Sequence, residues 1–165
     1  MIGVQGQSVR PLRFDWNLKF TRPATRLAHE YWESCRAGRT MPTRADLKPA
    51  AMHKFTEHVG LVEVRAEPGP DVDYFIRRAG TKWEQVFGPM TGRLIHDFLP
   101  PEIETRWREV FDPVRTRVVP VRVTTGITFQ RKTWLETEMF VGPLGADRVS
   151  MLFLTFVSWS ALTDS

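Results

Sequence analysis

The sequence predicts a single α+β domain with five β-strands, and three observations support this class. The chain has 165 residues, a length that suits one domain. Its composition, 42% hydrophobic and 25% charged, is that of an ordinary globular protein and argues against disorder or a coiled coil. Helical and β-rich segments follow one another in the order helix, two strands, several short helices, one longer helix, three strands.

The first 24 residues predict a flexible basic arm in front of the domain. They mix Gly, Gln and Arg with isolated aromatics and show no sustained period. Residues 1–25 carry four basic residues and one acidic residue, and so hold most of the net charge of +4. The remaining chain is nearly neutral, whereas a nucleic-acid-binding domain is expected to have a basic face. We therefore expect no nucleic-acid partner.

The helix that opens the domain is amphipathic. Between residues 25 and 38, apolar side chains recur at i, i+4 and i+8, and the segment ends at a glycine. Asp46 is expected to cap a short helix that begins near Pro49, where a missing N–H does no harm. Residues 59–64 and 72–78 are rich in β-formers and are separated by Pro and Gly, which predicts a hairpin.

The middle of the chain predicts short helices followed by one longer helix. Helical turns are expected around Trp83 and around Leu94, each bounded by Gly or Pro. Residues 103–114 then carry the strongest helical period of the chain. Pro113 is expected to kink or end that helix, because proline removes a backbone donor.

The last fifty residues predict a three-stranded meander. Its strands are expected at residues 118–129, 134–141 and 149–159, with turn chemistry between them. The final strand is apolar on both faces, so we expect it to be central in the sheet and covered on both sides. The cover over its outer face is expected to come either from the amphipathic helix of the same chain or from a second subunit.

Several motifs resemble one small, often stand-alone family of the PAS superfamily, found mainly in alphaproteobacteria. Residues Met41 to Pro49, with the sequence MPTRADLKP, resemble the opening motif of that family. The downstream sequences YFIR (residues 74–77) and AGT (residues 79–81), with the FG and TG pairs at residues 87–88 and 91–92, resemble its central run. The resemblance covers roughly residues 25–160.

This resemblance implies a PAS fold, which is a five-stranded antiparallel sheet with short helices on one face, here preceded by the N-terminal amphipathic helix. It implies one PAS-like domain at residues 25–160, leaving residues 161–165 as a C-terminal tail. Gly80 and Gly92 would lie where strand gives way to helix, at positions that need a positive φ or close backbone approach. PAS domains sense small molecules, cofactors or redox state, or mediate protein contacts in signalling.

The resemblance also implies a pocket on the helical side of the sheet, which would hold a small apolar ligand if it is not filled by side chains. A plain hydrophobic core explains the same residues equally simply. These residues are Trp83, Phe87, Ile95, Leu99, Trp107, Phe111, Leu135, Met139 and Phe153. The sequence does not identify a cofactor.

The histidines give weak signals for metal or haem. His53 and His58 resemble a zinc motif but lie five residues apart, so on a helix their rings would not share a metal. His96 is the one candidate haem ligand by position, although a surface pair with Asp97 is the simpler interpretation. We expect no metal site and no catalytic residues, because no nucleophile motif accompanies the histidines.

Two further groups invite functional readings that we set aside. Glu136 and Glu138 share one strand face with the spacing of a carboxylate pair. Because Leu135 and Met139 form the more apolar face, we expect both glutamates to point away from the pocket, towards solvent or an interface. Cys35, the single cysteine, is expected to be a small buried hydrophobe and excludes an internal disulfide.

The leading hypothesis is a non-catalytic, stand-alone PAS module of bacterial signalling that acts through a partner protein or through homodimerisation. The alternatives are a sensor with a small molecule or haem in its pocket and, less favoured, a small enzyme on a cone-like α+β fold. No apolar run is long enough to cross a bilayer and no secretory signal is recognisable, so we expect a cytoplasmic protein without membrane insertion.

Overall fold

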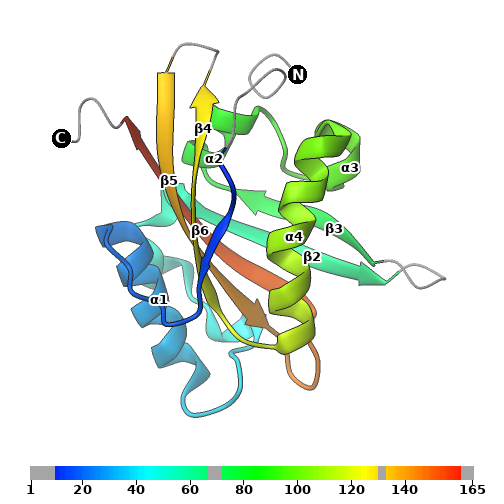
Figure 1. The fold of residues 1–165 in the computed structure, drawn as a ribbon. Coiled ribbons are helices and arrows are strands. Elements are labelled where there is room, and N and C mark those ends of the chain that lie inside the picture. The colour runs from blue at the N-terminus through cyan, green and yellow to red at the C-terminus, as the bar shows by residue number, and fades with distance from the viewer. Residues whose placement is uncertain (1–9, 67–71, 130–132, 161–165) are drawn as a thin grey trace.

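A six-stranded antiparallel sheet forms the centre of the fold (Figure 1). The computed structural model of the chain describes residues 10–66, 72–129 and 133–160. The strand order is β1-β4-β5-β6-β2-β3. The strands are β1 (Arg13–Asp15), β2 (Val59–Ala66), β3 (Val72–Ala79), β4 (Val121–Phe129), β5 (Thr133–Leu144) and β6 (Met151–Ser160). The predicted α+β class is confirmed, with one strand more than expected.

The hairpin and the meander are both confirmed. β2 pairs with β3, and β4, β5 and β6 are neighbours in that order. β6 also pairs with β2, so the strand that is apolar on both faces lies inside the sheet as predicted. The turns expected at residues 67–71 and 130–132 lie outside the described residues.

Helices cover the two faces of the sheet. α1 (Pro23–Arg36) packs on β5 and β6 from one side, while α2 (Thr81–Phe87), α3 (Ile95–Phe98) and α4 (Pro101–Arg117) lie on the other (Figure 1). Three 3₁₀ turns, Arg44–Asp46, Pro49–Met52 and Thr56–His58, connect α1 to β2. Asp46 does not cap the turn at Pro49; it accepts the Thr43 N–H (2.8 Å) at the preceding turn.

The cover on the outer face comes from the same chain. The indole Nε1 of Trp32, on α1, donates to the carbonyl of Pro143 (3.1 Å), and its ring packs against Phe140. This close approach requires Gly142, because a Cβ there would come within 2.7 Å of the Trp32 Nε1. The sequence left open whether this helix or a second subunit covers the outer face of β6, and the structure shows that the helix does.

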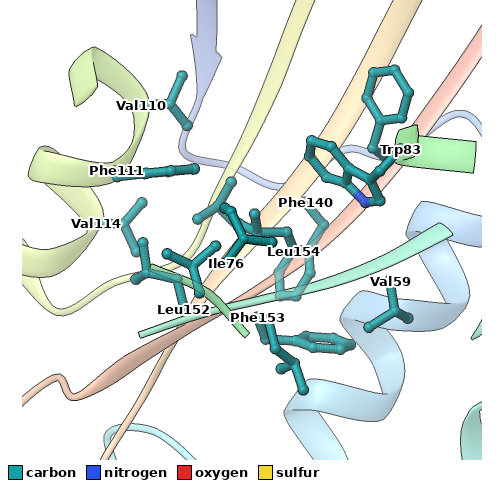
Figure 2. Close-up of a cluster of buried hydrophobic side chains, with 14 of the residues drawn as sticks. Val59, Ile76, Trp83, Val110, Phe111, Val114, Phe140, Leu152, Phe153 and Leu154 are labelled. Atoms are coloured by element: carbon teal, nitrogen blue, oxygen red, sulfur yellow. The ribbon is translucent and has the colours of Figure 1, made fainter. Parts of the chain in front are cut away.

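The long helix α4 is held against the sheet by an apolar face. Figure 2 shows Val110, Phe111 and Val114 projecting from α4 towards the strands. The helix does not end at Pro113 but continues to Arg117, because Val114 on the following turn is fully buried. Burial of three apolar side chains outweighs the backbone hydrogen bond that proline removes.

Two glycines of the family motif have the roles expected of them. Gly92 has φ +82°, in the left-handed region that favours glycine. A Cβ on Gly80 would collide with the backbone carbonyl of Glu57, so glycine there allows the 3₁₀ turn to pack against the end of β3.

The segment before α1 is packed on the sheet, at least from Arg10 onward, and the prediction of a flexible arm is wrong for these residues. β1 pairs with the edge of β4, placing Phe14 opposite Val123. The Arg10 guanidinium also reaches Glu136 on β5 (2.6 Å). Residues 1–9 of the expected arm lie outside the described part of the chain.

The arm and α1 are tied to the sheet by one buried carboxylate. Glu138 on β5 has no exposed surface and accepts the backbone N–H groups of Thr21 and Arg22, both at 3.0 Å. It also accepts the hydroxyls of Thr21 and Thr25, and the guanidinium of Arg122 at 2.7 Å. Burial alone would raise the pKa of Glu138, but hydrogen bonds from Thr25, Thr21, Arg122 and Arg22 outweigh it and lower the pKa.

The expectation that both glutamates face solvent or an interface is therefore corrected. They do point away from the pocket, as the strand alternation predicted. However, the outer face at Glu138 is covered by the start of α1, where backbone N–H groups point towards the carboxylate and the helix dipole favours an anion. Glu136 is only partly covered, with 23% of its side chain exposed beside Arg10.

We predict that Glu138→Ala lowers the free energy of unfolding by about 3–5 kcal/mol, because it leaves several buried N–H and O–H donors unpaired and leaves Arg122 with Asp15 as its one carboxylate partner among the described residues. Glu136→Ala, the matched control two residues away, removes a pair with an exposed partner and should cost about 1 kcal/mol or less. Urea unfolding at pH 7 measures both. An equal effect of the two substitutions would contradict the role given to Glu138.

The same carboxylate predicts an acid dependence. Since the folded-state pKa of Glu138 is lowered, its stabilisation is present above the unfolded pKa of about 4.3 and is lost as the pH falls through the folded value. The stability difference between wild type and Glu138→Gln should therefore shrink below about pH 4.3. A difference that stays constant between pH 7 and pH 3 would show that the charge of Glu138 does not matter.

Candidate functional site

An apolar cavity of about 60 Å³ lies between the sheet and the helices α2 and α4. Six elements or segments meet around it: the arm, α2, α4, β4, β5 and β6. The residues that line it are Leu12, Trp83, Phe87, Ile103, Arg106, Trp107, Val110, Phe111, Thr125, Ile127, Thr137, Met139 and Phe156. A buried water needs about 10–15 Å³ of such space, so the cavity admits only a small molecule.

More than half of the predicted pocket residues line this cavity. The five that do so are Trp83, Phe87, Trp107, Phe111 and Met139. Ile95 and Leu99 are buried in the surrounding core, and Leu135 packs against that core without lining the cavity.

Phe153 was placed on the wrong face of the sheet. Its ring packs against Phe140, 6.0 Å between centroids, on the side that α1 covers (Figure 2). Phe156, three residues further along β6, has the opposite orientation and lines the cavity instead. β6 carries apolar residues on both faces, and its polar residues Thr155 and Ser158 lie on opposite faces, so the sequence does not show which face each aromatic takes.

Aromatic rings form one wall of the cavity. Trp83 lies 4.7 Å from Phe156 and 5.9 Å from Trp107, measured between ring centroids, and Phe87 meets Trp107 edge-on at 5.1 Å. The Trp83 Nε1 donates to the backbone carbonyl of His58 (2.8 Å), so this indole presents only its apolar surface to the cavity. Such a wall suits an apolar or aromatic molecule.

The polar groups of the cavity lie on α4 and on the strands β4 and β5. Arg106 donates from Nη2 to the hydroxyl of Thr125 (3.0 Å). That hydroxyl in turn donates to the carbonyl of Arg10 in the arm (2.8 Å). Thr137 donates its hydroxyl to the carbonyl of Thr125 (3.1 Å). The site thus combines an apolar wall with one guanidinium.

Sequence reasoning did not select Arg106, Leu12 or Thr125 as site residues. Arg106 is one of several arginines on α4, and nothing in the helical period separates it from the solvent-facing ones. Leu12 precedes a three-residue strand that carries no recognisable pattern. For Thr125, the alternation along β4 predicts the face of the sheet on which it lies. The sequence did not predict a position for the arm that contacts it.

The candidate haem ligand His96 does not line the cavity. Its side chain is 46% exposed and lies between Asp73 (3.0 Å) and Asp97 (3.2 Å). No histidine or cysteine is among the cavity-lining residues; Met139 is the one lining residue of a type that serves as an axial ligand, and a cavity of about 60 Å³ is far too small for haem.

The remaining candidates are dispersed. His53 is exposed, whereas the ring Nδ1 of His58 lies 2.9 Å from the carbonyl of Phe156. Cys35 is partly buried, with its Sγ 3.6 Å from the carbonyl of Asp46. Within residues 10–66, 72–129 and 133–160, no three His, Cys, Asp or Glu side chains gather in a way that could hold a metal ion.

A family model described as a PAS domain matches residues 20–155, which is most of the chain. No curated protein matches the sequence. The matched segment contains α1, the cavity-lining helices, the four strands β2 to β5 and the first half of β6, and it begins just after β1. Among the described residues, none of the helices has the length and apolar character needed to span a membrane.

We predict that Met139→Trp fills the cavity and is tolerated. Because space adjoins Met139, the larger side chain should cost less than the 1–3 kcal/mol or so typical of an overpacked core. Val141→Trp is the matched control, since Val141 has no exposed surface, lies on the same face of β5 and does not line the cavity. Thermal and urea unfolding compare the two, and an equal loss of stability would show that no usable cavity exists at Met139.

Proposed function

This chain belongs to the PAS domain family, whose members serve as sensor or interaction modules, and we propose that it is a non-catalytic sensor of bacterial cytoplasmic signalling. In this proposal a small molecule occupies the aromatic cavity, and its presence is passed to a partner protein through the surface of the domain. The cavity itself is the observation that carries the proposal.

The position of the cavity supports a sensing role. Its lining comes from the arm, two helices and three strands, so a molecule bound there contacts segments far apart in the sequence. A ligand shifts the balance between conformations by the difference in its affinity for them. Because so many elements line the site, a conformational change caused by the ligand would reach the surface of the domain directly.

The structure also bears on self-association. The sequence predicted a homodimer because an apolar face of the sheet needed a cover. In the structure, α1 of the same chain covers that face. We therefore favour a contact with a different signalling protein over a dimer through the sheet.

A second candidate, an interaction module with no ligand, is favoured by the small size of the cavity. Ligand pockets usually measure about 300–1,000 Å³, and this cavity is about 60 Å³. In that case the aromatic residues would form a loosely packed core whose role is purely structural.

Native and denaturing mass spectrometry of the purified protein separate the two candidates. If the protein is a sensor, the native spectrum should show an additional small mass that disappears on denaturation. The same mass should be absent from Met139→Trp, in which the cavity is filled. A native mass equal to the chain mass, together with no stabilisation by any compound in a screen of small apolar molecules, would favour the interaction module.

A further inference from the structure

Arg106 is the charged group of the cavity, and its surroundings differ from those of neighbouring arginines. Arg108, on the same helix, pairs with Glu104 (2.9 Å) and Asp73 (3.3 Å), and Arg122 pairs with Glu138 (2.7 Å). Within the described part of the chain, Arg106 forms no ion pair, and its hydrogen-bond partner is the neutral hydroxyl of Thr125. A guanidinium has five N–H donors, so most of its donors remain available.

The guanidinium of Arg106 is partly desolvated and, among the described residues, has no carboxylate within ion-pair distance. Arg106 is partly buried, and burial lowers the pKa of its guanidinium, while the carboxylate of Glu109 on the next turn opposes that shift. A desolvated charge is normally compensated by an opposite charge and by further hydrogen bonds. Arg106 therefore lies beside an apolar cavity with most of its capacity to bind an anion unused.

The remaining polar groups of the cavity do not compensate this charge. The Thr125 hydroxyl is fully used, because it accepts from Arg106 and donates to the Arg10 carbonyl. Thr137 donates to the Thr125 carbonyl and has no proton left for a ligand. No aspartate or glutamate is among the lining residues. The cavity thus has positive charge at one point and is otherwise apolar or neutral.

We propose that the ligand of this cavity is a small monocarboxylic acid with an apolar tail, an inference that rests on the proposed sensor function. Its carboxylate binds the Arg106 guanidinium, a geometry in which two parallel N–H···O bonds form. Its tail packs against the aromatic wall formed by Trp83, Trp107 and Phe156.

Size and charge narrow the class further. A cavity of about 60 Å³ is well below the roughly 150 Å³ of an apolar cavity that binds benzene, so it holds a short-chain acid such as acetate or propionate, and neither an aromatic acid nor a long fatty acid. A dicarboxylate or a phosphate would bring a second negative charge against aromatic and aliphatic side chains, where it finds no donor. The expected ligand therefore carries one negative charge at one end.

Calorimetric titration with acetate and propionate tests this inference, with propionamide as the neutral counterpart of propionate. Quenching of the tryptophan fluorescence reports occupancy of the site, since Trp83 and Trp107 both line it. We expect propionate to bind about tenfold or more tightly than propionamide, because only propionate pairs with the guanidinium.

Substitutions at Arg106 locate the binding. Arg106→Gln should weaken propionate binding about tenfold or more while leaving propionamide binding almost unchanged. Arg106→Lys keeps the charge but loses the paired geometry, and should give an intermediate affinity. Arg26→Gln, at an exposed position of α1, is the matched control and should bind propionate as wild type does. Circular dichroism melts confirm that each variant is folded.

The outcomes separate this inference from the proposed function. Equal binding of propionate and propionamide, or propionate binding that survives Arg106→Gln, overturns the carboxylate class while leaving an apolar sensor possible. If none of the three probes binds and the native mass equals the chain mass, the sensor function fails and the ligand class fails with it.

Discussion

The fold depends on how one buried carboxylate is satisfied. Glu138 lies at the centre of a long strand with no access to water, and it keeps its charge because five donors surround it. Those donors come from the arm, from the start of α1 and, through Arg122, from β4. The same arrangement places Leu12 at the cavity and brings the Arg10 carbonyl to Thr125, so the edge of the candidate site depends on an interaction across the opposite face of the sheet.

The two faces of the sheet have become chemically different as a result. On the α1 side, charge is neutralised within the chain: Glu138 and Asp15 share Arg122, and Trp32 packs over Gly142 with little free space. On the α4 side, aromatic rings leave an unfilled volume, and the guanidinium at its border forms no ion pair with any residue that the structure describes. Packing of the first face stabilises the fold, and any capacity to bind a small molecule is concentrated on the second.

Periodic patterns predicted most of this fold. The helices, the hairpin, the meander and the central position of β6 all follow from residue spacing, and the family motif follows from short sequences such as MPTRADLKP. Five aromatic or sulfur-containing cavity residues were found because they lie on a helix or strand whose apolar face is distinct. These are local signals, readable without knowledge of what covers each face.

The features that were missed or wrongly predicted depend on contacts between segments far apart in the sequence, which no local pattern reveals. β1 has three residues and is stabilised by pairing with β4, more than a hundred residues away, so no local pattern marks it. Glu138 has the alternation of an outward-facing residue, and only the position of α1 turns that face into an interior. Arg106 is distinguished from the other arginines of its helix by lining the cavity, which appears only in three dimensions. The position of residues 10–22 also has a consequence for synthesis, because their partners, β4 and Glu138, are translated more than a hundred residues later. This segment can take its place on the sheet only after almost the whole domain has been translated.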